Sequence, residues 1–177
     1  MPARPPGVAA VVLAAGAATR FGSPKQRLLL PRVLERLARA GIEDVVVVAG
    51  AYELAAGGAR VVVAGDWERG PGASLRAGLA ALGPDVAAAV VVLADGPTLA
   101  PSAVERVLAA WRSGAGDAVA AGYAGARGHP LVLSRAAWAD VPDEGLRYVP
   151  ATLVPCDDLG SPGDVDTPAD LRALDEE

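Results

Sequence analysis

The sequence predicts a three-layer α/β/α fold with a mostly parallel central sheet, because apolar strand-like runs alternate with helix-like segments along the chain. The runs are continuous rather than alternating, as in strands that helices cover on both faces. The predicted strands lie at 8–14, 44–49, 60–64, 87–94, 117–121 and 130–133. The predicted helices lie at 30–40, 74–82, 102–111 and 167–174.

Each helix has its own signal. The first carries an apolar stripe, with Val33 and Leu37 on one face, and Gly41 stops it. Ser74 is a suitable cap for the second. The last places a proline at its first helical position, where the missing N–H costs little, directly after Thr167. Trp111 and Trp138 are expected to pack in the core or between helices.

Length and composition indicate one domain over residues 1–177, with a hydrophobic fraction of 52% that is sufficient for a real core. The formal net charge of −5 argues against a nucleic-acid surface. The single cysteine, Cys156, cannot form an internal disulfide, which fits a reducing cytoplasm. The first apolar run is too short to span a membrane and is expected to be a buried strand.

The loop after the first strand has the features of a phosphate site. Gly16 and Gly22 allow backbone N–H groups to approach an anion closely, and Arg20 and Lys25 add two positive charges. Arginine offers a planar fork for phosphate oxygens, and lysine offers a point charge. The loop is neither a Walker loop nor a dinucleotide fingerprint, because the required spacings are absent. As a bare turn it could also be purely structural.

Two acidic segments end near predicted strand edges. Asp95 follows a buried strand, where a hard cation could meet a phosphate, and Asp164 and Asp166 precede the last helix. Residues i and i+2 of an extended segment point the same way, so either of the latter two could approach Asp95. The structural alternatives are that Asp95 caps the turn before Pro97 and that Asp166 caps the last helix.

The segment Leu13-Ala-Ala-Gly-x-x-x-Arg-Phe-Gly-x-Pro-Lys25 resembles the signature of the MobA-like nucleotidyltransferases, and is closest to the molybdenum-cofactor cytidylyltransferase branch. The resemblance implies a Rossmann-like nucleotidyltransferase fold. In that family the loop wraps the triphosphate, and the positions of Arg20 and Lys25 stabilise charge during transfer. It implies nucleotide contacts from the first part of the loop, at Leu13, Ala14, Ala15 and Gly16. The alanine at position 15 favours CTP over GTP.

Further matches extend the resemblance along the chain. Asp95-Gly-Pro resembles the family's metal site, and Asp164-Val-Asp-Thr-Pro-Ala-Asp-Leu171 resembles the segment that completes it, so Mg²⁺ on Asp95 and Asp166 is implied. Asp170 is expected to be structural. The segment from Trp67 to Leu79 resembles the part near the nucleotide and implicates Ser74 and Gly78, although an ordinary capped helix is the alternative.

Two acceptor-side elements also match. Gly128-His129-Pro130 and Asp143-Glu-Gly-Leu-Arg147 implicate His129 and Arg147 in binding the acceptor. A lone histidine is more often structural, and Arg147 could instead only pair with Asp143. The segment after Lys25 departs from the family, because it lacks the usual glycine turn before the helix. This departure leaves the identity of the acceptor open, and the oligomeric state is open as well.

The resemblance implies an enzyme that moves a nucleoside monophosphate, CMP from CTP, onto a phosphorylated small molecule such as molybdopterin cofactor, with release of pyrophosphate. Two other functions stay open. Some similar alanine-rich chains are NAD(P)H-dependent nicotine blue oxidoreductases, although this sequence has no dinucleotide fingerprint. The shortened segment after Lys25 would also suit an accessory protein that holds a nucleotide without turning it over.

Overall fold

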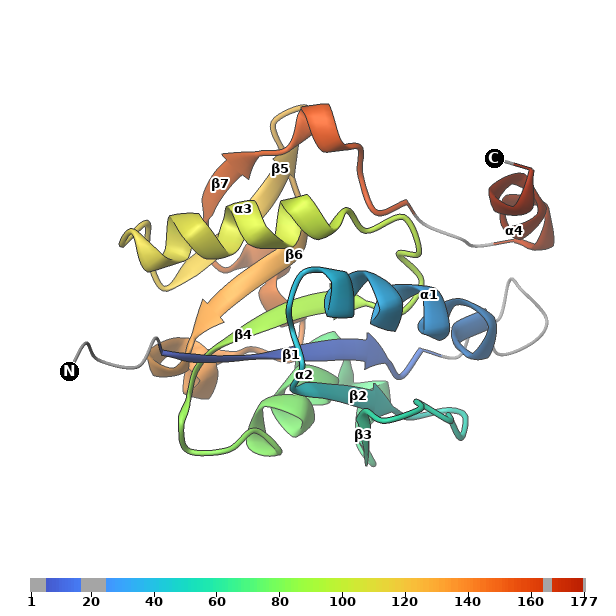
Figure 1. The fold of residues 1–177 in the computed structure, drawn as a ribbon. Coiled ribbons are helices and arrows are strands. Elements are labelled where there is room, and N and C mark those ends of the chain that lie inside the picture. Colours follow the sequence, from blue (N-terminus) through green and yellow to red (C-terminus); the bar gives the residue numbers. More distant parts are fainter. Residues whose placement is uncertain (1–5, 17–24, 164–166, 177) are drawn as a thin grey trace.

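The computed structural model describes residues 6–16, 25–163 and 167–176, and within these ranges seven strands form one sheet (Figure 1). The strands are β1 (Gly7–Ala14), β2 (Val45–Ala49), β3 (Arg60–Val63), β4 (Val86–Leu93), β5 (Ala118–Tyr123), β6 (Ala126–Ser134) and β7 (Thr152–Pro155). Their order across the sheet is β3-β2-β1-β4-β6-β5-β7. Among these seven, β6 alone runs antiparallel to its neighbours. The mostly parallel sheet expected from the sequence is confirmed.

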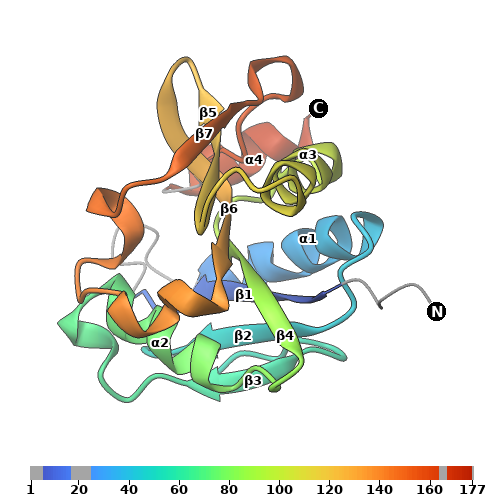
Figure 2. The ribbon, with the colours of Figure 1, turned by 90° about the vertical axis from the view of Figure 1, so that its left-hand side faces the viewer.

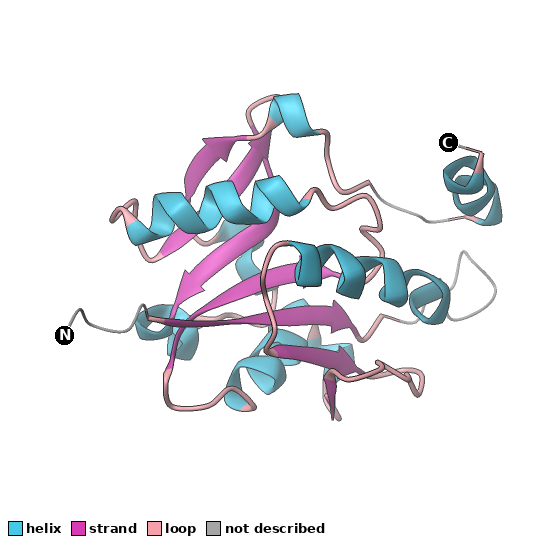
Figure 3. Ribbon diagram, in the orientation of Figure 1, coloured by secondary structure: helices cyan, strands magenta, loops and turns pink. Residues whose placement is uncertain are grey.

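Helices lie on both faces of the sheet, which confirms the three-layer arrangement (Figures 2 and 3). The described α-helices are α1 (Lys25–Arg39), α2 (Pro71–Ala80), α3 (Pro101–Arg112) and α4 (Pro168–Asp175). Helices α1 and α3 lie together on one face, and α2 lies on the other (Figure 2). Short 3₁₀ helices connect the remaining segments, among them η1 (Trp67–Arg69), η2 (Arg135–Asp140), η3 (Gly145–Tyr148) and η4 (Asp157–Leu159).

The alternation of side chains along β1 explains why its sequence is apolar throughout. Ala10 and Val12 join the core under α1 and α3, whereas Ala9 and Val11 join the core under α2. All four are fully buried. A strand between two helical layers has no solvated face, so a polar residue at either parity would lose its hydration without gaining a partner.

Helix α1 begins at Lys25, five residues before the start expected from the sequence. Pro31 lies inside this helix, where proline is unfavourable because it removes one backbone N–H. Burial of the inward face offsets that loss, because Leu29, Leu30 and Val33 are at most 1% exposed. Lys25, the last basic residue of the predicted phosphate loop, is therefore the first residue of the helix.

Helix α2 also begins earlier than expected. The sequence predicted Ser74 as its cap, but the helix starts at Pro71, so this prediction is wrong. Proline's fixed φ suits the first helical turn, and this preference prevails over the capping preference of serine three residues later. Ser74 is instead an interior helical residue with 3% of its surface exposed. Gly78 packs against the sheet, since a Cβ there would lie 2.6 Å from Val11 Cγ1 and 2.7 Å from Val48 Cγ2.

Helix α4 has the expected proline in its first turn and is capped by Thr167. The Thr167 hydroxyl accepts a hydrogen bond from the backbone N–H of Asp170, whose carboxylate accepts one from the N–H of Thr167. This capping box gives Asp170 the structural role expected of it and leaves the cap position to Thr167 rather than Asp166. Leu171 and Leu174 pack on Leu29, which joins α4 to the first turns of α1.

Trp111 and Trp138 pack as the sequence suggests. Trp111 lies partly buried at the end of α3, where its Nε1–H donates to the Ser134 hydroxyl over 2.8 Å. Trp138 packs against the α2 core, and its Nε1–H donates to the carbonyl of Leu133 over 3.0 Å. Each indole therefore buries its apolar body and satisfies its single donor.

Candidate active site

The carboxyl ends of β1 and β4 lie side by side at one edge of the sheet. Leu13 pairs with Leu93 in the parallel register, and the N–H of Ala94 donates to the Leu13 carbonyl over 3.0 Å. The backbone that leaves β1 through Gly16 therefore runs beside the backbone that leaves β4 through Asp95. Ligands of open parallel sheets bind outside this edge.

Asp95 lies in a tight turn. The N–H of Gly96 donates to the Leu93 carbonyl over 3.2 Å, which ends β4 and leaves the Asp95 side chain half-buried at the sheet edge. A Cβ on Gly96 would lie 3.1 Å from the Cβ of Pro162, so a larger residue here would require Pro162 to move by a few tenths of an ångström. The turn is thus packed closely against a segment that comes from the opposite end of the chain.

That segment, Ser161–Gly163, is fixed to the turn after β4 by Thr98. The Thr98 N–H donates to the Pro162 carbonyl over 3.0 Å, and its hydroxyl donates to the Ser161 carbonyl over 3.1 Å. Gly163 also lies against Thr98, since a Cβ on this glycine would lie 3.0 Å from the Thr98 hydroxyl oxygen. The chain that leads to Asp164 and Asp166 therefore passes along the turn that carries Asp95, although both aspartates lie outside the described residues.

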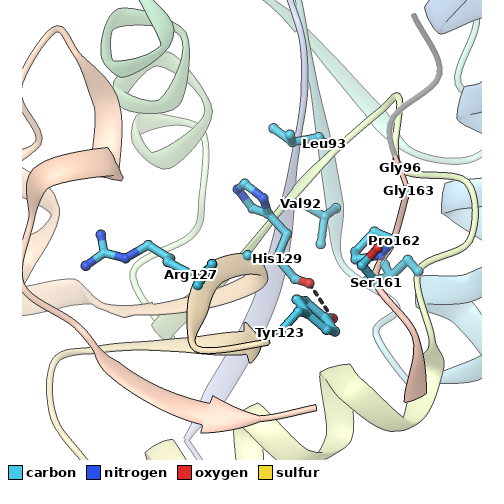
Figure 4. Close-up of a pocket in the computed structure, with 12 residues that line it drawn as sticks. Val92, Leu93, Gly96, Tyr123, Arg127, His129, Ser161, Pro162 and Gly163 are labelled. Carbon is cyan, nitrogen blue, oxygen red and sulfur yellow. Dashed lines mark hydrogen bonds between the residues drawn. The ribbon is translucent and has the colours of Figure 1, made fainter. Parts of the chain in front are cut away.

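A cavity of about 360 Å³ opens between the end of β4, the start of β6 and Ser161–Gly163 (Figure 4). Val92, Leu93 and Leu99 form part of an apolar wall, and Tyr123 adds an aromatic ring. The Tyr123 hydroxyl donates to the carbonyl of His129 over 2.9 Å. The imidazole of His129 also lines this cavity (Figure 4).

His129 lies close enough to Asp95 for the carboxylate to affect its pKa. Burial lowers the pKa of His129 below its ordinary value, and the nearby Asp95 carboxylate opposes part of that effect. The imidazole is therefore neutral near pH 7 and can both donate and accept a hydrogen bond. Binding of the acceptor by His129 stays a prediction.

Arg127 also lines the cavity, but its guanidinium points away from Ser161–Gly163 (Figure 4). Its Nη1 donates to the carbonyl of Leu146, and it lies 3.4 Å from the carbonyl of Arg147. Arg127 thus ties the cavity wall to η3. Arg127 was not among the predicted site residues, although its position directly before Gly128-His129-Pro130 could have indicated it.

The donor set at this edge fits a hard divalent cation bound together with phosphate. In residues 6–16, 25–163 and 167–176, no three His, Cys, Asp or Glu side chains gather as a metal cluster. Asp95 is one carboxylate at the carboxyl end of a strand, and Mg²⁺ commonly takes one or two carboxylates with water and phosphate oxygens. Asp95 would hold the cation from the protein side, with Asp166 as the second carboxylate that the motif implies.

Asp143 does not pair with Arg147, contrary to one alternative left open by the sequence. Its carboxylate accepts hydrogen bonds from Arg76 over 2.5 Å and from Arg69 over 3.1 Å. Arg147 is exposed, with its guanidinium 5.8 Å from the centre of the Tyr148 ring. The cause is the packing of α2, which brings Arg76 against Asp143; Arg147 is not among the residues that line the cavity.

The same packing covers the first turn of α2. The N–H of Gly72 donates to the Asp143 carbonyl over 2.9 Å, so this helix-terminal donor is already used within the protein. Arg76 adds a bond of 2.7 Å from Nη1 to the carbonyl of Val141. The sequence led us to expect that α2 starts at Ser74 and donates N–H groups from there to the nucleotide. The helix starts at Pro71 instead, so this expectation was based on the wrong helix start. Part of the start at Pro71 is occupied by residues 141–143.

We expect Asp143→Asn to lower the stability of the protein at neutral pH and to have little effect in acid. The hydrogen bond from Arg76, helped by Arg69, holds the pKa of the Asp143 carboxyl below its ordinary value of 3.8. A carboxyl with a lowered pKa stabilises the fold above its unfolded-state pKa, and this stabilisation is lost as the pH falls through the lowered value. Urea unfolding at pH 7 and at pH 3, which lies below the ordinary pKa of 3.8, should show a smaller difference between the variant and the wild type at pH 3.

The neighbouring carboxylate supplies the control, because Glu144 is exposed and precedes η3 without an ion pair among the described residues. Glu144→Gln should leave the urea midpoint unchanged at both pH values. A stability difference between the wild type and Asp143→Asn that stays the same from pH 7 to pH 3 would contradict the role assigned to this ion pair.

The structure brings together some of the predicted site residues. Asp95, His129 and the backbone from Leu13 to Gly16 meet at one edge of the sheet. Ser74 and Gly78 lie within α2, where Gly78 serves the contact with the sheet. The predicted residues outside the described set are Arg20, the side chain of Lys25, Asp164 and Asp166.

These features define an α/β nucleotide-binding fold with an acidic group and a cavity at the carboxyl edge of a parallel sheet. The family model described as "MobA-like NTP transferase domain" matches residues 10–147. The chain therefore belongs to the MobA-like NTP transferase family, as its motifs indicated. The matched range includes Asp95 and His129 and ends at Arg147.

Individual relatives cover nearly the full chain. A protein named nicotine blue oxidoreductase from Paenarthrobacter nicotinovorans is 34% identical, over 96% of this chain and 97% of its own. The alignment runs over 203 positions, more than the 177 residues of this chain, so this chain carries gaps relative to that protein.

Solved structures show the same arrangement. Rv0371c from Mycobacterium tuberculosis H37Rv superposes with a TM-score of 0.77 at 30% identity, over 97% of this chain and 99% of that one. A complex of the same protein with manganese gives 0.73 at 27% identity over the same shares. A divalent cation therefore accompanies a similar structure. In the part of this chain that the structure describes, no helix is long and apolar enough to cross a membrane.

Proposed function

We propose that this protein transfers a nucleoside monophosphate, CMP from CTP, onto a phosphorylated small-molecule acceptor such as molybdopterin cofactor, and releases pyrophosphate. The observation that carries the proposal is the position of Asp95. It lies just after the carboxyl end of β4, beside the backbone that leaves β1 through Gly16, and close enough to His129, which lines the cavity, to influence the pKa of that imidazole. The lone, buried and free Cys156 agrees with a reducing cytoplasm as the site of action.

In the proposed reaction the backbone from Leu13 to Gly16 binds the triphosphate, and Arg20 and Lys25 neutralise charge that grows on the α-phosphate and the pyrophosphate. Asp95 and Asp166 would hold Mg²⁺, which would supply positive charge to stabilise the phosphates. The acceptor lies in the cavity against His129 and attacks the α-phosphorus in line, so that the bond to pyrophosphate breaks. Catalysis then consists of positioning and electrostatic stabilisation, without a covalent enzyme intermediate.

The test is the release of pyrophosphate from each of the four ribonucleoside triphosphates, with Mg²⁺ or Mn²⁺ and a panel of phosphorylated acceptors. Lys25→Ala should lower the rate by about 100-fold or more, because it removes a cation that stabilises developing charge. Arg39→Ala is the matched control, since Arg39 is an exposed cation in the last turn of the same helix. Full activity of Lys25→Ala would overturn the proposed mechanism.

A second candidate is an NAD(P)H-dependent reductase. The observation that favours it is the 34% identity to the protein named nicotine blue oxidoreductase. The loop after β1 lacks a dinucleotide fingerprint, which is why we rank the transferase first. Reduction of a dye or quinone by NADPH in the absence of a divalent cation would support this alternative. A third candidate, an accessory protein, would bind CTP tightly and release no pyrophosphate with any acceptor.

A further inference from the structure

Gln26 is a buried amide in the first turn of α1, directly after Lys25. Only 5% of its surface is exposed. Its Nε2 donates to the carbonyl of Gly16 over 2.9 Å. Its Oε1 is buried and has no hydrogen-bond partner within the described part of the chain. Buried polar atoms are paired in the great majority of cases, so this unpaired oxygen requires an explanation.

The fold of the free protein does not require an amide at this position. Gly16 is exposed, so water could satisfy its carbonyl if Gln26 were replaced. An apolar side chain of similar length would fill the same space and remove the unpaired Oε1, which is unfavourable where it lies. Natural sequences keep such unfavourable groups mainly where function needs them. The bond to Gly16 is therefore the feature to explain.

Gly16 is the residue at which β1 gives way to the proposed phosphate-binding backbone. Without a Cβ, glycine adopts many backbone conformations, and its peptide group can turn either its N–H or its carbonyl toward a ligand. A carbonyl oxygen carries a negative partial charge, which phosphate repels, whereas N–H groups attract it. The orientation of this peptide should therefore affect the affinity for a triphosphate.

We propose that Gln26 is a positioning residue for the nucleotide, which holds the Gly16 carbonyl toward α1 and so keeps that oxygen from facing the triphosphate. This inference rests on the proposed nucleotide-binding function. It assigns Gln26 no contact with the reacting atoms. The unpaired Oε1 of Gln26 is unfavourable in the free protein. The bond from Gln26 to Gly16 becomes favourable for binding once the nucleotide is present.

The test uses Gln26→Met in the full chain, because methionine matches glutamine in length and neither donates to Gly16 nor buries an amide. Calorimetry should show that the dissociation constants of Mg·CTP and Mg·GTP rise by roughly five- to tenfold, the size expected for one lost hydrogen bond. The melting temperature without ligand should stay the same or rise. Val33→Ala is the control for a purely structural change in α1, since Val33 is fully buried. This control should melt earlier and bind both nucleotides as the wild type does.

Each other outcome overturns the inference in a recognisable way. If the wild type binds Mg·CTP or Mg·GTP and Gln26→Met binds it equally well, Gln26 does not position the nucleotide, and the proposed function stands. If Gln26→Met melts earlier by as much as Val33→Ala, its amide is a structural requirement of the free fold. If the wild type binds neither nucleotide, the proposed function fails and the inference fails with it.

Discussion

Asp95→Asn is expected to lower the rate of pyrophosphate release by about 100- to 1000-fold while the protein stays folded, because the variant keeps the shape of the side chain and removes its charge. The carboxylate lies at the carboxyl end of β4, where the turn at Gly96 and the bonds from Thr98 to Ser161 and Pro162 fix the surrounding backbone. Steady-state pyrophosphate release with CTP and Mg²⁺ measures the effect. The dependence of melting temperature on Mg²⁺ with CTP should be lost in parallel.

Asp85→Asn is the matched control. Asp85 is exposed and precedes the opposite end of the same strand. This control loses the same charge from the protein and should keep the wild-type rate. If the two variants have equal activity, Asp95 is not part of the catalytic site. Asp95 would then have only the structural alternative named above, in which it caps the turn before Pro97.

Gly72→Ala is expected to lower the free energy of unfolding by about 2–3 kcal/mol, the upper part of the range for overpacking. A Cβ at this position would overlap the carbonyl oxygen of Pro142. Because the obstacle is backbone rather than a flexible side chain, residues 141–143 would have to move away from α2. That movement would also break the hydrogen bond from the Gly72 N–H to the Asp143 carbonyl. Urea unfolding followed by circular dichroism measures the change.

Gly83→Ala provides the comparison, since a Cβ on Gly83 meets no atom within 4 Å. The same added methyl group should leave stability within a few tenths of a kcal/mol, as for most surface substitutions. A Gly72→Ala protein as stable as Gly83→Ala would mean that residues 141–143 are not held tightly against the first turn of α2.

The layers of the fold followed from the sequence because buried parallel strands produce continuous apolar runs. The ends of the elements did not follow. Helix α1 begins five residues early in spite of Pro31, because packing of its inward leucines outweighs the local preference of proline. Strand β7 was missed because only Leu153 and Val154 lie between Thr152 and Pro155, so no apolar run marks it, unlike the three valines of the equally short edge strand β3.

The site was predictable where it depends on single strand ends and not where it depends on packing between distant segments. Asp95 could be placed because it follows a long apolar strand. The hydrogen bonds of Asp143 with Arg76 and Arg69 span 67 and 74 residues, and no local pattern indicates them. Tyr123 and Ser161–Gly163 meet at the cavity only through the order of strands in the sheet.

Thermal unfolding with CTP, GTP, NADH and NADPH, each with and without Mg²⁺, tests the central claim that this edge of the sheet binds a nucleoside triphosphate with a divalent cation. A ligand that binds the native state at about 100 times its dissociation constant adds about 2.7 kcal/mol of stability. We predict a rise in melting temperature with CTP that requires Mg²⁺ and is lost in Asp95→Asn. No shift with either triphosphate, together with a shift for NADPH that is independent of Mg²⁺, would contradict the transferase account and favour a reductase.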